Sequence, residues 1–127
     1  MMAYNKYRNK KTEIDGIKFA SKKEGLRYVE LKSLQERGKI TCLVCQPKFE
    51  LQAKFEDIIT GVKYRSINYV ADFTYICDAG VIVEDVKPTG KDGKVSKYYK
   101  STPPYAVFMI KQKLFEKKYP DLTIEIV

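Results

Sequence analysis

The sequence is organised around residues 70–87, which read VADFTYICDAGVIVEDVK. Two runs of β-branched and aromatic residues flank a turn at residues 78–80, and this pattern predicts a β-hairpin. Each run carries an acid that an apolar strand does not favour, Asp72 in the first and Asp85 in the second. Because strand side chains alternate between faces, Asp85 and Lys87 are expected to point the same way.

The number of residues in the hairpin connection decides whether the two acids meet. With an even number, Asp72 lies opposite Asp85 across the hairpin. With an odd number, Asp72 pairs with Val86 instead. In the even register, two carboxylates and the amine of Lys87 share one patch of the sheet.

Two facing carboxylates repel each other unless something compensates their charge. A divalent cation held between them removes the repulsion, and hard cations such as Mg²⁺ take oxygen ligands, often carboxylates together with a substrate phosphate. A simpler alternative is an ion pair between Asp85 and Lys87 at a sheet edge, with Asp72 solvated.

The composition bounds the class of protein. A chain of 127 residues with 44% hydrophobic and 31% charged residues predicts one globular domain, residues 1–127. The net charge of +8 favours an anionic partner, nucleic acid first. No apolar run reaches membrane-spanning length and the N-terminus has no signal-peptide pattern, so we expect a cytoplasmic protein without a membrane partner. The absence of histidine excludes Ser-His and Cys-His triads and a histidine general base.

The first half of the chain predicts a helix and several strands. Residues 1–20 are expected to form a basic N-terminal arm on a phosphate backbone. Ser21 and Glu24 form a capping box that begins a helix running to about Arg37, where Gly38 can supply the left-handed C-cap. Strands are expected over 39–44, 49–55 and 69–76.

The second half predicts a basic loop, a helix and a last strand. Residues 88–102 read as a mobile basic loop that covers an anionic ligand, with a disordered insertion as the alternative. Prolines at 103 and 104 open a helix that ends at Pro120, and 122–126 alternate as a strand. The apolar stripe of this helix is expected to consist of Val107, Ile110, Leu114 and Phe115.

The element order resembles the restriction-endonuclease-like fold and its PD-(D/E)xK nuclease superfamily. Asp72 and the string Asp85-Val86-Lys87 match the core motif, and Glu24 matches the acid of the first helix. The wider pattern is similar to TnsA-like transposase endonucleases and to a family of small uncharacterised phage proteins. Ala71 stands where the motif has proline, and the neighbouring Glu84 leaves open which acid is the second one.

The resemblance implies an α/β (α+β) fold of order α-β-β-β-α-β, with a mixed central sheet flanked by helices. It implies a Mg²⁺- or Mn²⁺-dependent DNA endonuclease that hydrolyses phosphodiester bonds, with branched or junction DNA in phage DNA processing as a candidate substrate. The protein would act in the cytoplasm, that of a bacterial host cell if it is phage-encoded, and it would need no organic cofactor. The chain could form a homodimer. Two alternative functions remain open: a non-catalytic DNA-binding protein on a nuclease-like fold, and a basic RNA-binding protein.

The implied site divides into three groups of residues. The catalytic residues are Glu24, Asp72, Asp85 and Lys87. The metal ligands are Asp72, Asp85 and the Val86 carbonyl, with Glu24 as a ligand of a second metal, directly or through water. The substrate-binding residues are Gln46, Lys91, Lys94, Lys97, Lys100, Lys111 and Lys113.

Overall fold

A computed structural model describes residues 11–127, and residues 1–10 of the expected N-terminal arm lie outside this range. The chain forms three helices and ten strands within it. They are β1 (Thr12–Ile14), β2 (Ile17–Phe19), α1 (Lys22–Glu36), β3 (Thr41–Cys45), β4 (Lys48–Gln52), β5 (Phe55–Glu56), β6 (Lys63–Tyr64), β7 (Ile67–Val70), β8 (Phe73–Cys77), β9 (Gly80–Asp85), α2 (Lys97–Lys100), α3 (Pro103–Lys118) and β10 (Ile124–Ile126).

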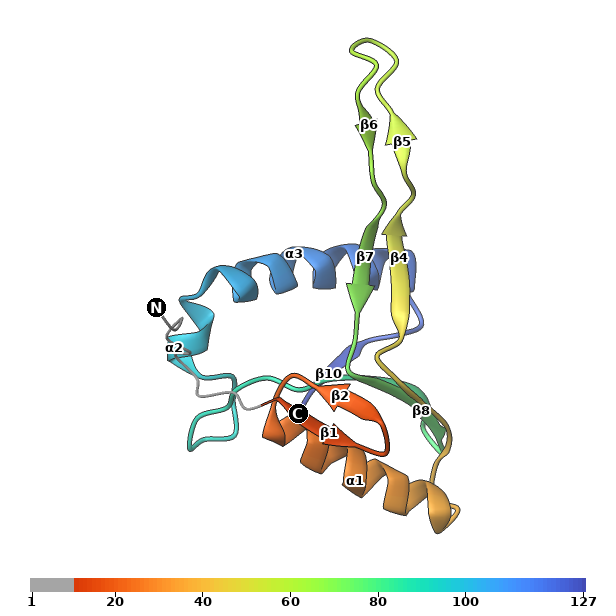
Figure 1. Cartoon of the computed structure of the whole chain (residues 1–127), viewed down its shortest axis with the longest axis vertical. Helices are drawn as coiled ribbons and strands as arrows, with labels where there is room; N and C mark the ends of the chain where they lie inside the picture. Colours follow the sequence, from red (N-terminus) through yellow and green to blue (C-terminus); the bar gives the residue numbers. More distant parts are fainter. Residues whose placement is uncertain (1–10) are drawn as a thin grey trace.

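The centre of the molecule is a mixed four-stranded sheet in the order β10-β9-β8-β3. Strands β3, β8 and β9 are antiparallel neighbours, whereas β10 runs parallel to β9. Together with α1 and α3, these strands follow the expected order α-β-β-β-α-β. The expectation of a mixed sheet with helices in an α+β protein is therefore confirmed (Figure 1).

The β8–β9 hairpin has the even register. Cys77 pairs with Gly80 across a two-residue connection, and the ladder continues to Phe73 opposite Glu84. One further step brings Asp72 level with Asp85. The odd alternative, which paired Asp72 with Val86, is excluded as the register of the sheet.

Two apolar clusters cover the two faces of the central sheet. One joins α1 to the sheet and contains Leu31 and Phe73, both fully buried. The other joins α3 to the sheet and contains Val83 and Phe115, also fully buried. Successive residues of β9 consequently point into different surroundings, which matters for the acids at its end.

The capping box begins α1 as expected. The backbone N–H of Glu24 donates to the Ser21 hydroxyl at 3.1 Å, and a Glu24 carboxylate oxygen accepts from the N–H of Ala20 at 3.2 Å. The helix ends at Glu36, and Gly38 has φ +74°, the left-handed conformation that suits a helix C-terminus.

The described residues of the expected N-terminal arm form a β-hairpin that packs on the helix α1. Residues 12–19 form the β1–β2 hairpin, whose last residue, Phe19, is only 2% exposed. The hairpin packs on α1 at Gly25, where a Cβ would lie 3.1 Å from a methyl group of Thr12. A side chain at Gly25 would therefore force Thr12 and Ile14 of the hairpin to shift by a few tenths of an ångström.

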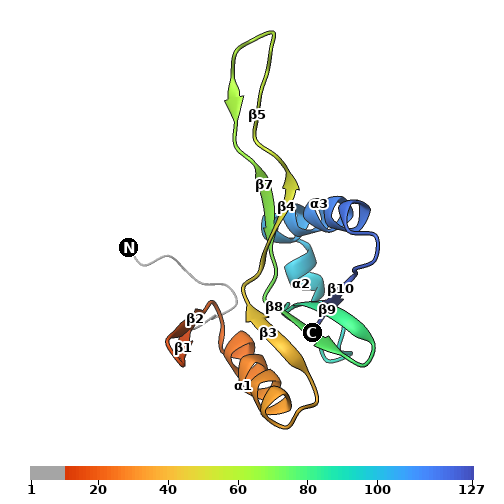
Figure 2. The same cartoon turned by 90° about the vertical axis from the view of Figure 1, so that its right-hand side faces the viewer.

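The strand expected over 69–76 is two strands that belong to different sheets. β7 ends at Val70 and pairs with β4, whereas β8 begins at Phe73 in the central sheet. The chain bends at Asp72 between them. Strands β4–β7 with the β5–β6 extension form a two-stranded ribbon, called the arm here (residues 48–70), that extends away from the body (Figures 1 and 2).

The expected loop over 88–102 is partly structured. Thr89 and Val95 form an isolated β-bridge, and Lys97–Lys100 form the helix α2. The apolar stripe expected on α3 is also wrong in part, because Phe108 and Phe115 are buried while Val107, Ile110 and Leu114 are exposed. None of the helices found in residues 11–127 is long and apolar enough to cross a membrane.

Candidate active site

Asp72 lies at the bend between the arm and the central sheet. One of its carboxylate oxygens accepts the backbone N–H of Val86 at 2.6 Å. Burial raises the pKa of Asp72 to about 8, and the nearby negative charges of Asp85 and Glu24 add to this rise. The group is therefore an acid held in a place where its negative charge is poorly compensated.

Asp85 ends β9 on the face of the sheet that meets α3. It is 4% exposed and holds two donors, the Tyr69 hydroxyl at 2.5 Å and the Lys87 amine at 2.7 Å. The Lys87 amine also lies 4.0 Å from the centre of the Phe108 ring, which comes from α3. The expected placement of Asp85 and Lys87 on one side of the chain is thus present, as an ion pair within the protein.

Glu24 reaches the same region from the first turn of α1. Burial raises the pKa of Glu24, the charge of Asp85 raises it further, and the charge of Lys87 lowers it. The capping role and the position beside the other acids therefore coexist. Glu24, Asp72 and Asp85 are called the acid cluster below.

Three carboxylates lie in this region, and the Lys87 amine binds that of Asp85 and lowers the pKa of Glu24. The amine of Lys23 also comes near, but it donates to the Lys87 carbonyl at 2.7 Å and to the Thr89 hydroxyl at 3.2 Å. It ties the start of α1 to the segment that follows β9. Burial first, and then the negative charges of Asp85 and Glu24, therefore keep the pKa of Asp72 high.

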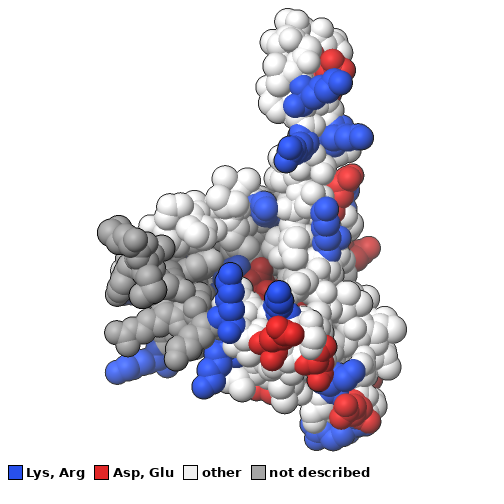
Figure 3. Space-filling model, in the orientation of Figure 1, with Lys and Arg blue, Asp and Glu red and all other residues white. Residues whose placement is uncertain are grey.

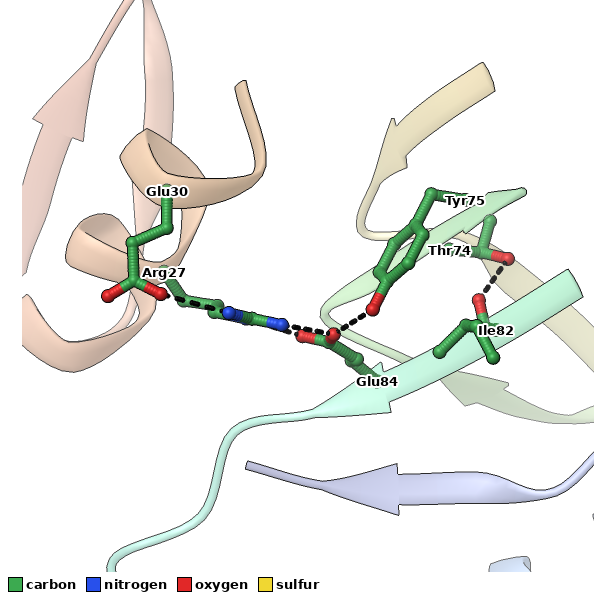
Figure 4. Close-up of polar contacts among 6 residues, drawn as sticks. All are labelled: Arg27, Glu30, Thr74, Tyr75, Ile82 and Glu84. Atoms are coloured by element: carbon green, nitrogen blue, oxygen red, sulfur yellow. Dashed lines mark hydrogen bonds and ion pairs between the residues drawn. The ribbon is translucent and has the colours of Figure 1, made fainter. Parts of the chain in front are cut away.

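Glu84 is the neighbour of Asp85, but it lies in the other face of the sheet. Arg27 of α1 holds its carboxylate with two hydrogen bonds, at 2.8 and 2.6 Å, and the Tyr75 hydroxyl donates to it as well (Figure 4). The hydrogen bonds to Glu84 are the main cause that raises the pKa of Arg27. Glu84 is fully compensated, so the acid that accompanies Asp72 is Asp85.

Gln46 lies next to the acid cluster through its backbone. Its N–H donates to the Asp72 carbonyl at 2.9 Å, whereas its side-chain amide donates to the Lys18 carbonyl at 2.7 Å. The side chain thus connects the end of β3 to the β1–β2 hairpin. Its expected role in substrate binding stays a prediction.

The lysines expected to bind substrate are spread over the loop and α3. Lys91, Lys94, Lys97 and Lys100 are all exposed. Lys111 is half-buried and follows Phe108 by one helical turn, so it faces the side of α3 that carries the ring beside Lys87. Lys113 is exposed and lies about 140° around the helix from Phe108, which turns it away from the acid cluster.

Three further residues of the site were not singled out from the sequence. Tyr69 and Phe108 contact the Asp85–Lys87 pair, and Arg27 compensates Glu84. The only sequence signal for Tyr69 was its place in an apolar run before Asp72. Among the described residues, 11–127, no three Cys, Asp or Glu side chains are arranged as they stand to hold a metal ion.

The comparisons with known proteins give a family for the chain but no activity. No curated protein and no solved structure matches it. One family model does match, over residues 4–127, and its description is Protein of unknown function (DUF1064). Because that match spans almost the whole chain, the protein belongs to the DUF1064 family.

Proposed function

We propose that this protein is a metal-dependent DNA endonuclease built on a restriction-endonuclease-like core. The observation that carries the proposal is the convergence of Asp72, Asp85 and Glu24 beside Lys87 at the end of the β8–β9 hairpin. A group of buried acids with a raised pKa and one adjacent amine is costly to a fold and is a common feature of active sites. The order of the helices and strands is compatible with such a core.

The donors of the acid cluster suit Mg²⁺ or Mn²⁺. Asp72 and Asp85 offer carboxylate oxygens, and the Val86 carbonyl follows directly in the chain, so the set is made of hard oxygen ligands. Burial and the neighbouring carboxylates raise the pKa of Asp72, and the charge of a divalent cation would offset the repulsion between these carboxylates. Its binding to Asp85 would compete with the Lys87 amine for the same carboxylate. Glu24 could contribute a further oxygen, directly or through water.

The residues of the chain divide the work of phosphodiester hydrolysis. A bound divalent cation lowers the pKa of its water and stabilises charge on the phosphate. Lys87 presents a protonated amine beside the carboxylates, where it can orient the attacking water or neutralise a phosphate oxygen. Tyr69 fixes one oxygen of Asp85 and so leaves the other for Lys87 or the metal.

DNA is the proposed substrate because of the balance of charges. The net charge of +8 favours a polyanion, and the exposed lysines at 91, 94, 97 and 100 offer phosphate contacts. A protein that only binds nucleic acid gains nothing from buried acids close to the phosphates, since they repel the ligand. The acid cluster therefore favours cleavage over binding alone.

The test is cleavage of linear, branched and single-stranded DNA, and of RNA as a comparison, with Mg²⁺, with Mn²⁺ and with EDTA. We expect cleavage of DNA that requires the metal and is lost in Asp72→Asn. If the protein binds duplex DNA but cleaves no substrate with either metal, the result would refute the nuclease and support the alternative, a non-catalytic DNA-binding protein. Cleavage of RNA in place of DNA would refute the proposed substrate.

Glu24→Gln separates the two roles of this residue. Glutamine keeps an oxygen that can accept the Ala20 N–H, so the start of α1 should remain intact. If Glu24 belongs to the active site, cleavage falls while the melting temperature stays within a few degrees of wild type. A variant that melts earlier and cleaves normally would assign Glu24 to the helix cap alone.

A further inference from the structure

The outer half of the arm, residues 53–66, makes few contacts with the rest of the protein, and its surface carries exposed isoleucines and several cations. The inner strands of the arm pack on α3, where Leu51 and Tyr69 are buried, but the outer strands β5 and β6 pair only with each other. At about 3.3 Å per residue, six residues from 53 to the end carry the ribbon about 20 Å beyond that packing. Both views show it standing clear of the body (Figures 1 and 2).

The end of the arm exposes two isoleucines, Ile58 at 98% and Ile59 at 92%, called the isoleucine tip here. They are held in an ordered turn, because the Asp57 carboxylate accepts the N–H of Ile59 at 2.8 Å and of Thr60 at 3.0 Å. The backbone of Asp57 also pairs with Val62 at 2.9 Å. The chain thus fixes a turn that presents two large apolar side chains fully to solvent.

The two faces of the outer arm differ in chemistry. Phe55 and Tyr64 stack across one face at 5.0 Å between ring centres, which stiffens the ribbon. The pairing of Glu56 with Lys63 defines the other face, and extending that register by two residues adds Lys54 opposite Arg65. Lys54, Lys63 and Arg65, called the cationic face, are all exposed and are accompanied there by one acid. Lys and Arg side chains are visible along the arm in Figure 3.

We propose that the arm binds duplex DNA, with the cationic face on the phosphates and the isoleucine tip inserted as a wedge at a base step. Apolar side chains used this way enter from the minor groove and kink the duplex. This inference rests on the proposed function for the choice of DNA as the partner. A second copy of the chain fits less well, because the three cations would face each other and two isoleucines fall far short of the about 800 Å² per partner of a stable interface.

The arm is also placed to serve the acid cluster. Its last strand, β7, ends at Val70, two residues before Asp72, and Tyr69 of the same strand donates to Asp85. DNA held by the arm is therefore tied to the site through a short, hydrogen-bonded connection.

The test measures binding and bending of an end-labelled duplex by fluorescence energy transfer in EDTA, in the Asp72→Asn background so that no cleavage occurs. Ile58→Ser with Ile59→Ser should abolish the bend while most of the affinity remains. The control is Val107→Ser with Ile110→Ser, an apolar pair on α3 that is 51% and 60% exposed, which should bend DNA normally. Lys54→Gln, Lys63→Gln and Arg65→Gln together should reduce the salt slope of log affinity by about 2.7, at about 0.9 per phosphate contact.

Further controls separate this inference from the proposed function. Lys32→Gln, Arg37→Gln and Lys39→Gln, at the far end of α1, should leave the salt slope unchanged. Unchanged bending and slope in the arm variants, with normal cleavage by the otherwise wild-type chain, would overturn the role of the arm alone. Arm-dependent bending by a protein that never cleaves would support the arm and overturn the nuclease. A tip variant that turns a dimer into a monomer by light scattering, with bending intact, would make the arm a self-association element and overturn the inference.

Discussion

Glu84 and Asp85 are adjacent acids at the end of one strand, equally buried at 1% and 4% exposure, and they have opposite surroundings. Glu84 faces α1, where a guanidinium and a tyrosine hydroxyl satisfy both of its oxygens. Asp85 faces α3, where the Lys87 amine and the Tyr69 hydroxyl hold its two oxygens, and two further carboxylates, Asp72 and Glu24, lie near it. The difference teaches that burial of a single acid is not the signal of a site, whereas the crowding of several buried acids is.

The comparison also explains how the fold tolerates the acid cluster. The Arg27–Glu84 pair joins α1 to β9, and both residues lie within three positions of a cluster member, Glu24 and Asp85 respectively. The Arg27–Glu84 ion pair thus holds the helix and the strand that bring Glu24 and Asp85 close to Asp72. The four predictions below test this division, starting with the largest expected effect.

The largest effect is expected on cleavage. Asp85→Asn removes a charged metal ligand and should lower metal-dependent cleavage by about 10³-fold or more, because metal-ion catalysis is worth several kcal/mol. Glu84→Gln, one residue away, should stay within about tenfold of wild type when measured well below its melting temperature. Cleavage rates of the two variants decide the matter, and a larger loss in Glu84→Gln would reverse the assignment of the second acid.

Glu84 should matter more for the stability of the protein than for cleavage. Glu84→Gln leaves the Arg27 charge without its carboxylate and should cost about 2–4 kcal/mol in urea unfolding, less than a fully buried pair because Arg27 is partly exposed. The matched control is Glu30→Gln, since Glu30 also contacts Arg27 at 2.9 Å but is largely exposed, and it should cost less than about 1 kcal/mol. Equal losses in both variants would mean that Glu84 is not the compensated partner described here.

The pH dependence of stability should reveal the raised pKa of Asp72. Its ordinary pKa is 3.8 and burial raises it to about 8, so the folded state binds more protons than the unfolded state between these values. The free energy of unfolding of the wild type therefore falls as pH rises through that window. Asp72→Asn removes the titration, so in EDTA it should match the wild type near pH 4 and be more stable by about 1–3 kcal/mol near pH 8. A constant difference across this range would contradict the raised pKa.

The sequence predicted the part of this site that depends on local pattern. The hairpin and the capping box of α1 follow from alternation and spacing over short stretches. Alternation also limited the hairpin to two registers, and the structure has the even one, in which Asp72 and Asp85 were expected to meet. The sequence could not say which of Glu84 and Asp85 completes the site. That choice depends on Arg27, 57 residues away in the chain, and on the helix that carries it to one face of the sheet.

The arm and the buried face of α3 show why other expectations failed. Apolar residues occur on several sides of α3, so periodicity alone favoured Val107, Ile110 and Leu114 over the face that carries Phe108. The strand over 69–76 looked continuous because a bend at Asp72 needs no glycine or proline. Its two halves pair in different sheets, and only the tertiary pairing of β7 with β4 shows this.

The smallest effect should come from two tyrosines that treat the two acids alike. Tyr69 donates to Asp85 and Tyr75 donates to Glu84, and both side chains are buried. Tyr75→Phe should lower stability by about 1 kcal/mol, the value of one hydrogen bond, and leave cleavage unchanged. Tyr69→Phe keeps the ring in the core but loses the donor that orients Asp85, so Mg²⁺ affinity and cleavage should fall about tenfold, as for other residues that position a metal ligand. Mg²⁺ titrations of melting temperature and of cleavage rate measure both. A tenfold loss of cleavage in Tyr75→Phe but none in Tyr69→Phe would place the working acid on the α1 face, because only the hydroxyl that positions the catalytic carboxylate should affect the reaction.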